Sequence, residues 1–461
     1  MAPQHFLLVT YPAQGHVNPA LRFAHRLIRT TGARVTLATC LSIYHCSNIL
    51  NFDNVYNLSL LTFSDGYDDG VISTTEDVQK RLLNLERNGD KTLSEFIEAN
   101  RNGDSPVACV IYTILPSWVP KLARRFHLPS VLLWIQPALA FNLYYNHSTR
   151  TNSGFFEFPN LLTLETRDLP SFLSPSNTSN TAQAVYLDLM ECLKEESNVK
   201  VLVNTFDSLE PEALTAIPNI EMVAVGPLLP PHVFFTRSES VKDQSSYTLW
   251  LDSKTESSVI YVSFGTMVEL SKKQIEELAR ALIEWKMPFL WVITDKSNRE
   301  AKIEGEEETE IEKIAGFRHE LDEIGMIVSW CSQVEVLRHR AVGCFLTHCG
   351  WSSTLESLVL GVPVVAFPMW SDQPTNAKLL EDLWRTGVRV RENEEGLVER
   401  EEIRRCLEAV MEDKSVELRE NAEKWKRLAI KAGRERGSAD RNMETFVDSL
   451  FSEAEKVKDQ K

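Results

Sequence analysis

Two segments of the chain, far apart in sequence, repeat one order of elements. Each has a short apolar run, a turn that contains glycine and an amphipathic helical pattern, at residues 5–28 and 258–285. Further short apolar runs follow them, at residues 107–115, 129–136, 200–206, 287–294, 326–330, 343–347 and 362–368. Runs that are apolar on both faces and separated by helices are typical of parallel sheets covered on both sides. The pattern therefore predicts an α/β fold with two similarly built halves.

The helix that follows the first apolar run of each half has a predicted starting point. In the first half, Asn18 followed by Pro19 has the order of an N-cap and a first helical residue. In the second half, Ser271 and Gln274 have capping-box spacing. The apolar stripe of this second helix is Ile275, Leu278, Ala279 and Leu282.

The domain boundaries follow from composition. Residues 230–249 lie in a stretch rich in proline, serine and charge, which is typical of a linker. We therefore expect an acceptor-side domain at 1–229, a second domain at 250–437 and a terminal amphipathic helix at 438–461 that packs back on the first domain. The acidic stretch at 295–316 is expected to be a solvated loop or a frayed helix.

Charge and cysteine content exclude several classes of partner. The net charge of −16 over 461 residues argues against nucleic acid and against an anionic membrane surface. No apolar run approaches the ~20 residues of a membrane span, and the first residues lack the features of a secretory signal. The eight cysteines are scattered without a CxxC pair, which favours reduced thiols. We therefore expect a cytosolic protein, and no metal site because paired ligand spacings are missing.

Residues 343–361 combine an apolar run with a polar turn and a helical pattern. We expect GCFLT to be a strand, His348 to Trp351 to be the turn, Ser352 and Ser353 to start the helix and Gly361 to follow its end. The free N–H groups of such a helix start, together with its dipole, suit a phosphate. An ordinary helix cap is the alternative, with Glu356 completing a capping box on Ser353. The spacing alone leaves both interpretations open.

The longer stretch at residues 330–373 reads WCSQVEVLRHRAVGCFLTHCGWSSTLESLVLGVPVVAFPMWSDQ. It resembles the 44-residue signature of plant family 1 UDP-glycosyltransferases, and PAQGHVNP, GPL and YVSFG elsewhere in the chain resemble the same family. Within that family the chain looks most similar to indole-3-acetate β-glucosyltransferases, which form glucose esters. The resemblance implies a GT-B fold, with two Rossmann-like domains facing across a cleft. UDP-sugar would bind the C-terminal domain and the acceptor the N-terminal one.

The resemblance also implies which residues bind the nucleoside of the donor. Trp330 would stack on uracil, and Cys331 would offer backbone contacts beside it. Gln333 and Glu356 would bind the ribose hydroxyls, for which an amide and a carboxylate are suitable partners.

The diphosphate contacts implied by the resemblance are His348, Ser353 and Thr266, together with the backbone N–H groups of the turn. Ser352 stands where the family usually has asparagine, so one phosphate or sugar contact differs here. A serine hydroxyl can still donate a hydrogen bond.

The sugar contacts implied by the resemblance are Trp351, Asp372 and Gln373. Gln373 suits glucose over galactose within the family. UDP-glucose is thus the expected donor substrate, and no separate cofactor or metal is expected.

His16 occupies the position of the family's general base, in the turn after the first strand. The family usually orients this histidine with an aspartate, but Thr113 occupies that place here. Either another acid replaces the aspartate or the acceptor needs little deprotonation. Carboxylic acids are already ionised at pH 7, so the second explanation favours transfer to a carboxylate, with inversion, to give a β-glucose ester of an acid such as indole-3-acetate or a benzoate.

The acceptor pocket is expected in the N-terminal half. Trp134 and Gln136 lie at the end of the apolar run at residues 129–136, and Gln136 is the better candidate for contact with the acceptor or sugar. The aromatic residues of this stretch are core residues or an acceptor wall, and the sequence leaves both open.

Other functions remain open on the sequence alone. The nearest alternative is O-glucosylation of phenolic or flavonoid hydroxyls by the same mechanism. A dinucleotide-dependent oxidoreductase is disfavoured because no G-x-G-x-x-G follows a strand. A non-catalytic sugar-nucleotide-binding protein is a remote alternative. Nothing in the sequence requires an oligomer, so a monomer is expected.

Overall fold

The structure is a computed structural model that describes residues 3–43, 56–69, 75–147, 156–157, 162–174, 181–196, 198–234, 245–293, 309–412 and 415–458. The chain divides into two compact units. The first comprises Met1–Leu161, Phe172–Pro230 and Lys431–Lys461, and the second comprises Leu162–Ser171 and Pro231–Ile430. Ten residues from the first half of the sequence therefore belong to the second unit. Half of the expected linker, and most of the acidic stretch at 295–316, lies outside the described residues.

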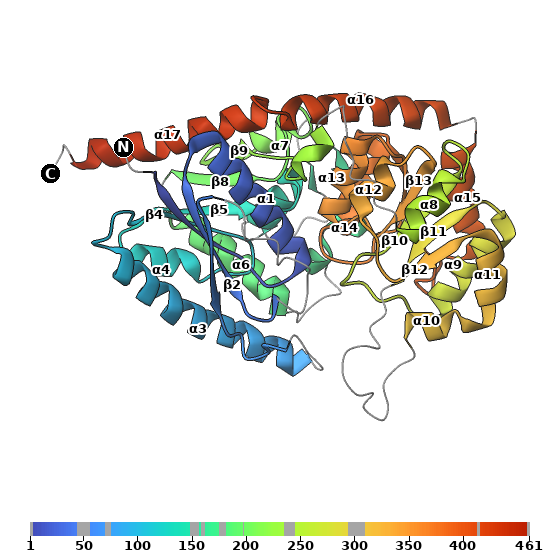
Figure 1. Cartoon of the computed structure of the whole chain (residues 1–461), viewed down its shortest axis with the longest axis horizontal. Helices are drawn as coiled ribbons and strands as arrows, with labels where there is room; N and C mark the ends of the chain where they lie inside the picture. The colour runs from blue at the N-terminus through green and yellow to red at the C-terminus, as the bar shows by residue number, and fades with distance from the viewer. Residues whose placement is uncertain are drawn as a thin grey trace. The chain divides into compact units, whose positions relative to one another are not determined.

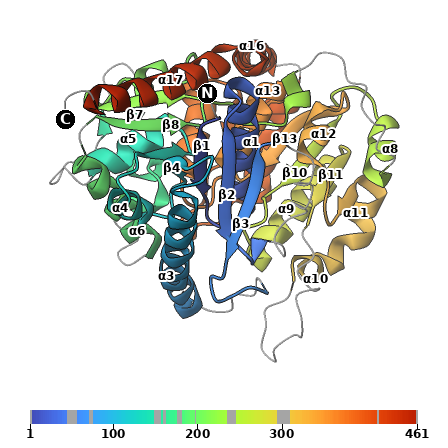
Figure 2. The same ribbon diagram turned by 60° about the vertical axis from the view of Figure 1, so that its left-hand side comes forward.

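The first unit is built on a seven-stranded sheet with the order β3-β2-β1-β4-β5-β8-β9. Its strands are β1 His5–Val9, β2 Arg34–Cys40, β3 Leu58–Phe63, β4 Val107–Tyr112, β5 Ser130–Trp134, β8 Val199–Val203 and β9 Ile220–Ala224. All neighbouring strands are parallel. Its helices are α1 Gln14–Thr31, α3 Thr75–Asn100, α4 Val119–Arg125, α5 Ala138–His147, α6 Thr181–Lys194, α7 Pro211–Leu214 and α17 Ser438–Lys458; Figures 1 and 2 show them around the sheet.

The second unit has a six-stranded parallel sheet with the order β12-β11-β10-β13-β14-β15. Its strands are β10 Val259–Ser263, β11 Phe289–Val292, β12 Met326–Val328, β13 Val342–Thr347, β14 Val364–Ala366 and β15 Gly387–Arg389. Its helices are α8 Ser246–Asp252, α9 Lys272–Trp285, α10 Glu310–Lys313, α11 Arg318–Ile324, α12 Gln333–Arg338, α13 Trp351–Leu360, α14 Gln373–Lys378, α15 Arg400–Met411 and α16 Val416–Gly433. The predicted pair of Rossmann-like α/β halves is confirmed.

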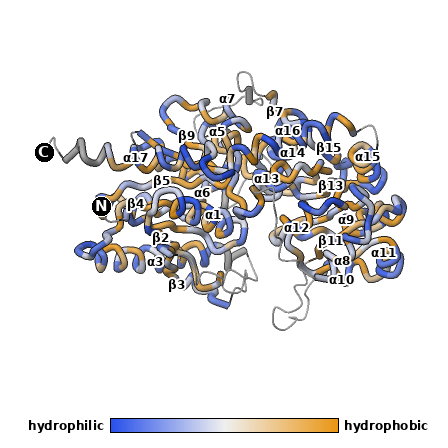
Figure 3. The backbone as a smooth tube through the Cα atoms, turned by 45° about the horizontal axis from the view of Figure 1, so that its top comes forward, coloured by the Kyte–Doolittle hydropathy of each residue, from blue (hydrophilic) through white to orange (hydrophobic). Residues whose placement is uncertain are grey.

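In both units the pattern of apolar residues matches the position of each helix and strand relative to the core. Hydrophilic and hydrophobic stretches alternate along the tube of α3 and α17 in Figure 3, as expected for helices with one apolar face. The central strands are apolar on both faces, and Phe6, Leu7 and Val9 of β1 are fully buried. No helix among the described residues is long and apolar enough to cross a membrane.

The start of α9 was predicted correctly. The Ser271 side chain accepts a hydrogen bond from the Gln274 backbone N–H at 3.2 Å. The expected stripe is fully buried, namely Ile275, Leu278, Ala279 and Leu282.

The predicted start of α1 was wrong. The helix begins at Gln14, with Ala13 as its N-cap and no side-chain cap. The backbone N–H groups of His16 and Val17 both donate to the Ala13 carbonyl at 2.9 Å, so the chain turns into the helix directly after the strand. Pro19 consequently lies inside the helix, where it leaves one backbone carbonyl without its usual donor.

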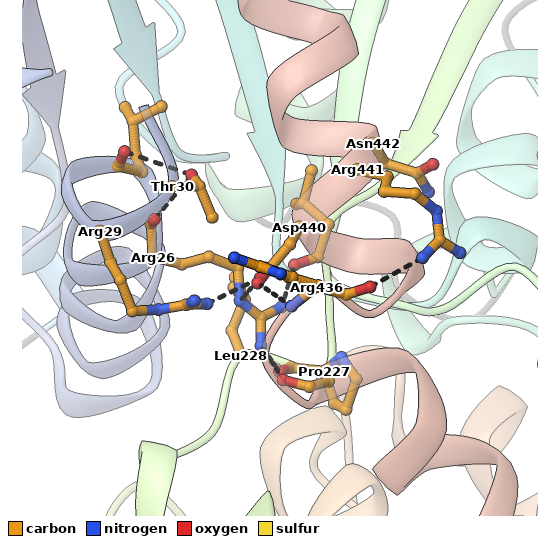
Figure 4. A network of polar contacts seen from close by, with 12 residues as sticks. Arg26, Arg29, Thr30, Pro227, Leu228, Arg436, Asp440, Arg441 and Asn442 are labelled. Carbon is orange, nitrogen blue, oxygen red and sulfur yellow. Dashed lines mark hydrogen bonds and ion pairs between the residues drawn. The ribbon is translucent and has the colours of Figure 1, made fainter. Parts of the chain in front are cut away.

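A buried arginine in α1 ties the C-terminal helix α17 to the first unit (Figure 4). The Arg26 guanidinium donates to the Val225 carbonyl at 2.7 Å and to the Gly433 carbonyl at 3.2 Å. Asp440 of α17 lies 3.6 Å from Arg26 and accepts a 2.7 Å bond from Arg29. Because Arg26 and Asp440 are both almost fully buried, each compensates the charge of the other.

We expect Asp440→Asn to destabilise the first unit by about 3–5 kcal/mol, because it leaves the buried Arg26 charge without a counterion. Thermal or denaturant unfolding of the full chain, followed by circular dichroism, measures the loss. Asp448→Asn is the matched control, since Asp448 is exposed on the same helix. Equal stability of the two variants would contradict this role for Asp440.

Candidate functional site

In the second unit, the strand order reverses direction at β10. This strand lies between β11 and β13, and Ser263 of β10 is in register with Thr347 of β13. The connections that leave β10 and β13 therefore depart in opposite directions at the carboxyl edge of the sheet. Ligands of open α/β sheets bind at this kind of position.

His348 lies at this switch point between two glycines. A Cβ atom on Gly265 would lie 2.9 Å from the imidazole Cε1, and one on Gly350 would lie 2.6 Å from Nε2. Gly265 also has a φ of +72°, which side chains other than glycine rarely adopt. The two glycines thus form a slot for the imidazole. Burial lowers the pKa of His348 to about 4, so the ring is neutral at pH 7.

The helix after this turn begins one residue earlier than predicted. Gly350 is the N-cap of α13, Trp351 is its first residue, and Gly361 ends it with a φ of 73°, as expected. Ser353 is consequently the third helical residue and forms no capping box. No side chain caps α13, so its first backbone N–H groups can donate to an anion.

Gln333 of α12 joins Ser353 and Glu356 of α13 in one hydrogen-bonded cluster. Its Nε2 donates to Ser353 Oγ at 2.9 Å and to Glu356 Oε2 at 2.6 Å. Its Oε1 accepts from the Tyr261 hydroxyl at 3.3 Å, and that hydroxyl lies 3.4 Å from Cys331 Sγ. Four of the residues implied by the family resemblance, Cys331 among them, therefore lie together. The sequence analysis missed Tyr261, although a hydroxyl in an otherwise apolar buried strand was a signal.

Trp330 follows β12 and presents a large apolar surface. Its side chain is 63% exposed, whereas the next residue, Cys331, is buried. An exposed indole beside a hydrogen-bonded polar cluster is suited to stacking on a flat ring. Thr266 is exposed directly after Gly265, and Ser352 is half-buried in the first turn of α13.

Asp372 follows β14 and is the N-cap residue of α14. Burial raises the pKa of its carboxyl to about 6. The Asn376 side-chain amide donates to Asp372 Oδ2 at 2.7 Å and to the Cys349 carbonyl at 2.9 Å. Asn376, which the sequence analysis also missed, therefore joins the His348 turn to Asp372.

Gln373 and Trp351 have structural contacts of their own. Gln373 Oε1 accepts from the backbone N–H groups of Met369 and Trp370, at 2.9 and 3.0 Å. Trp351 is buried with its ring centroid 6.0 Å from that of Trp384. The burial of Trp351 favours a packing role over direct contact with a sugar.

In the first unit, His16 also lies at a reversal of strand order, since β1 lies between β2 and β4. The residue is in the first turn of α1, not ahead of the helix as predicted. Its ring centroid is 5.5 Å from that of Tyr11 in an edge-on arrangement. Within the described part of the chain, its buried Nδ1 has no hydrogen-bond partner.

Thr113 is fully buried after β4, but it does not orient His16. Its hydroxyl donates to the Thr10 hydroxyl at 3.2 Å. The pKa of His16 is lowered to about 4, and burial is the cause. The structure therefore provides a neutral imidazole without a charged partner among the described residues.

The two expected acceptor contacts differ in their surroundings. Trp134 is fully buried, and its indole N–H donates to the Pro137 carbonyl at 2.9 Å. The Phe141 ring packs edge-on against it at 5.2 Å, which favours a core role. Gln136 Nε2 donates to the Tyr186 hydroxyl at 2.9 Å.

A metal is not suggested by the residues that the structure describes. No group of three or more histidine, cysteine, aspartate or glutamate side chains among them could hold an ion. Cys344 is a fully buried residue of β13.

Known proteins resemble the whole chain. The profile of the family described as UDP-glucoronosyl and UDP-glucosyl transferase matches residues 150–429. UDP-glycosyltransferase 75B2 of Arabidopsis thaliana is 80% identical over 98% of this chain and 100% of its own length. Phloretin 4'-O-glucosyltransferase of Malus domestica is 47% identical over 98% of each chain.

A solved structure with the same fold contains a bound nucleotide. Os79 from O. sativa in complex with UDP has a TM-score of 0.81 and 30% sequence identity. The match covers 96% of this chain and 100% of that one, which confirms the predicted GT-B class of two parallel-sheet Rossmann-like domains. With two such domains, a family profile that matches residues 150–429 and relatives matched end to end, the chain belongs to the plant family 1 UDP-glycosyltransferases.

Proposed function

We propose that this enzyme transfers glucose from UDP-glucose to small carboxylic acids, such as indole-3-acetate or benzoates, and forms β-glucose esters with inversion. The acceptor carboxylate oxygen attacks the anomeric carbon, the bond from that carbon to UDP breaks, and the electron pair leaves with UDP. No proton has to be removed from an ionised acid. No metal or further cofactor is needed for this step.

The donor half of the proposal rests on the polar cluster of the second unit. We assign uracil to the exposed Trp330 with Cys331 beside it, and the ribose hydroxyls to Gln333 and Glu356. The diphosphate is assigned to the uncapped start of α13, together with the side chains of Thr266, His348, Ser352 and Ser353. Helix dipole and N–H donors stabilise the charge that develops on UDP as it leaves.

The sugar of the donor is assigned to Asp372 and Gln373. Asp372 is held by Asn376, so its carboxylate is oriented before a sugar arrives. A carboxylate and an amide can each hydrogen-bond to sugar hydroxyls.

The proposal of a carboxylic acid as the acceptor rests on the environment of His16. A general base is most effective when its pKa is near the operating pH, whereas the pKa of His16 is lowered to about 4. With no carboxylate among the described residues to stabilise an imidazolium, this histidine is a weak base. An acceptor that is already ionised does not need a stronger one.

The buried acids of the first unit do not replace the missing aspartate. Asp65 accepts from Arg81 at 2.6 Å and from Ser42 at 2.8 Å. Glu210 accepts from the first backbone N–H groups of α5, at 3.1 Å. Asp440 is paired with Arg26 and Arg29. Each of these carboxylates already has partners within the described residues, which supports an acceptor that needs little deprotonation.

Transfer to phenolic hydroxyls is the second candidate. It is favoured by the likeness to phloretin 4'-O-glucosyltransferase at 47% identity. In that reaction His16 would take the phenol proton as the new bond forms, and its neutral ring has the required free nitrogen.

The location and assembly of the enzyme are also part of the proposal. We expect a cytosolic monomer, and the free thiols found at every described cysteine agree with a reducing compartment.

His16→Ala separates the two acceptor classes. We expect kcat/KM for a phenolic acceptor to fall by about 10²–10⁴-fold, the usual contribution of a general base. For a carboxylic acid we expect less than about a tenfold loss, because no proton is transferred. Product chromatography with UDP-glucose and each acceptor measures both, and mild alkali distinguishes labile esters from stable phenolic glucosides. An equal loss for both acceptors, or wild-type enzyme that makes no ester, contradicts the proposed acceptor.

UDP-glucose binding should depend on the ionisation of Asp372. Its pKa is raised to about 6, so the carboxylate predominates above that pH and becomes protonated below it. We therefore expect UDP-glucose affinity to weaken as the pH falls from 7 to 5. Asp372→Asn should bind more weakly at pH 7 and lose this pH dependence. Titration calorimetry at several pH values tests the assignment, which fails if both proteins show the same pH profile.

Gly350→Ala tests whether His348 and its turn hold the diphosphate. The added Cβ would meet the imidazole Nε2 at 2.6 Å, so the ring would have to move. We expect UDP affinity to fall by about tenfold or more, the value of one hydrogen bond to a charged group. Gly316→Ala is a control at a glycine of the same unit, where an added Cβ would meet nothing within 4 Å. A Gly350→Ala variant that binds UDP like wild type would remove His348 from the proposed phosphate contacts.

A further inference from the structure

The segment Leu162–Ser171 belongs to the second unit although it precedes the rest of that unit by about sixty residues in sequence. It contains the short strand β7 Thr163–Leu164 and a 3-10 turn at Thr166–Asp168. The segment packs on α14, the helix that begins at the proposed sugar contact Gln373. None of its residues belongs to the family signature at 330–373.

Ser171 makes a reciprocal pair of hydrogen bonds with Ser371. The Ser171 backbone N–H donates to the Ser371 carbonyl, and the Ser371 N–H donates to Ser171 Oγ, both at 2.7 Å. Ser371 has a φ of +59°, in the left-handed region that costs a non-glycine residue free energy. Ser371 directly precedes Asp372, so Ser171 fixes the strained residue that aims this carboxylate.

Asp168 anchors the same segment. Its carboxylate, 1% exposed, accepts from Arg389 Nη1 at 2.7 Å, and Lys378 Nζ lies 3.7 Å away. Its backbone carbonyl accepts from the Thr375 hydroxyl of α14 at 2.7 Å. A buried carboxylate between two cations is rigidly placed, and through Thr375 it holds the first turn of α14.

We infer that Ser171 and Asp168 are positioning residues for the sugar end of the donor site. They touch neither the sugar nor the nucleotide; they hold the turn that carries Asp372 and Gln373. This inference rests on the proposed function, which assigns the sugar to those two residues. The proposed uridine contacts Trp330 and Gln333 follow another strand, so a defect in the segment should affect UDP-glucose more than UDP.

Ser171→Ala is the most specific test, because it removes only the side-chain oxygen that accepts a hydrogen bond from the Ser371 backbone N–H. We expect UDP affinity within about twofold of wild type, and UDP-glucose affinity lower by about three- to tenfold, the range for one lost hydrogen bond. Ser171→Thr keeps the hydroxyl and should restore UDP-glucose affinity. Thr166→Ala is the matched control, since Thr166 is an exposed hydroxyl residue of the same segment.

Asp168→Asn provides an independent test with a larger effect. It keeps the shape of the side chain and removes the charge shared by Arg389 and Lys378. We expect a lower melting temperature together with a larger ratio of UDP-glucose to UDP dissociation constants than in wild type. In turnover assays, KM for UDP-glucose should rise more than kcat falls.

Titration calorimetry on the full-length proteins measures the affinity of each variant for UDP and for UDP-glucose, and so tests the inference. The inference is overturned if Ser171→Ala binds both ligands like wild type, or if it and Asp168→Asn weaken both ligands by the same factor, as a purely structural role would. Failure of wild-type protein to bind UDP-glucose would instead overturn the proposed function, and the inference with it.

Discussion

The proposed donor site depends on how closely two backbone segments approach at the switch point between β10 and β13. A Cβ on Gly265 or on Gly350 would occupy the space of the His348 ring. The turn also holds Cys349 in the left-handed region at a φ of 62°, and both Thr354 and Asn376 donate to its carbonyl. This strain is maintained by fully buried polar contacts, and it leaves the first N–H groups of α13 directed outward at the carboxyl edge of the sheet.

The electrostatics of the two units differ in a way that bears on the chemistry. The second unit gathers N–H donors and a helix dipole at the place that we propose for the diphosphate of the leaving UDP. In the first unit, a neutral histidine lies among buried groups. The described buried carboxylates of that unit are paired with arginines or accept hydrogen bonds from backbone N–H groups. Under the proposed function, such an arrangement contributes little to proton removal and leaves most of the rate enhancement to positioning and leaving-group stabilisation.

Features that depend on local sequence could be predicted, and features that depend on tertiary contacts could not. The strands and the Ser271 cap follow from apolar periodicity and from a side chain three residues ahead of its partner. The start of α1 could not be predicted in this way, because Ala13 caps the helix through its backbone alone and offers no capping side chain. The Ser353–Glu356 capping box was equally plausible by spacing, but Gln333, twenty residues earlier, engages both side chains.

Residues that support the site were missed for the same reason. Tyr261, Asn376 and Asp168 bond to groups that only the folded chain brings near them, and Asp168 lies 221 residues from its partner Arg389. Their burial explains why they matter: a polar group removed from water must be satisfied by a fixed partner. Asn376 satisfies this condition for the Cys349 carbonyl and Asp372 at once. The turn proposed for the phosphates and the carboxylate proposed for the sugar are thereby fixed to one side chain. Under the proposed function, the distance between them is set before the donor binds, and little reorganisation remains for the transition state.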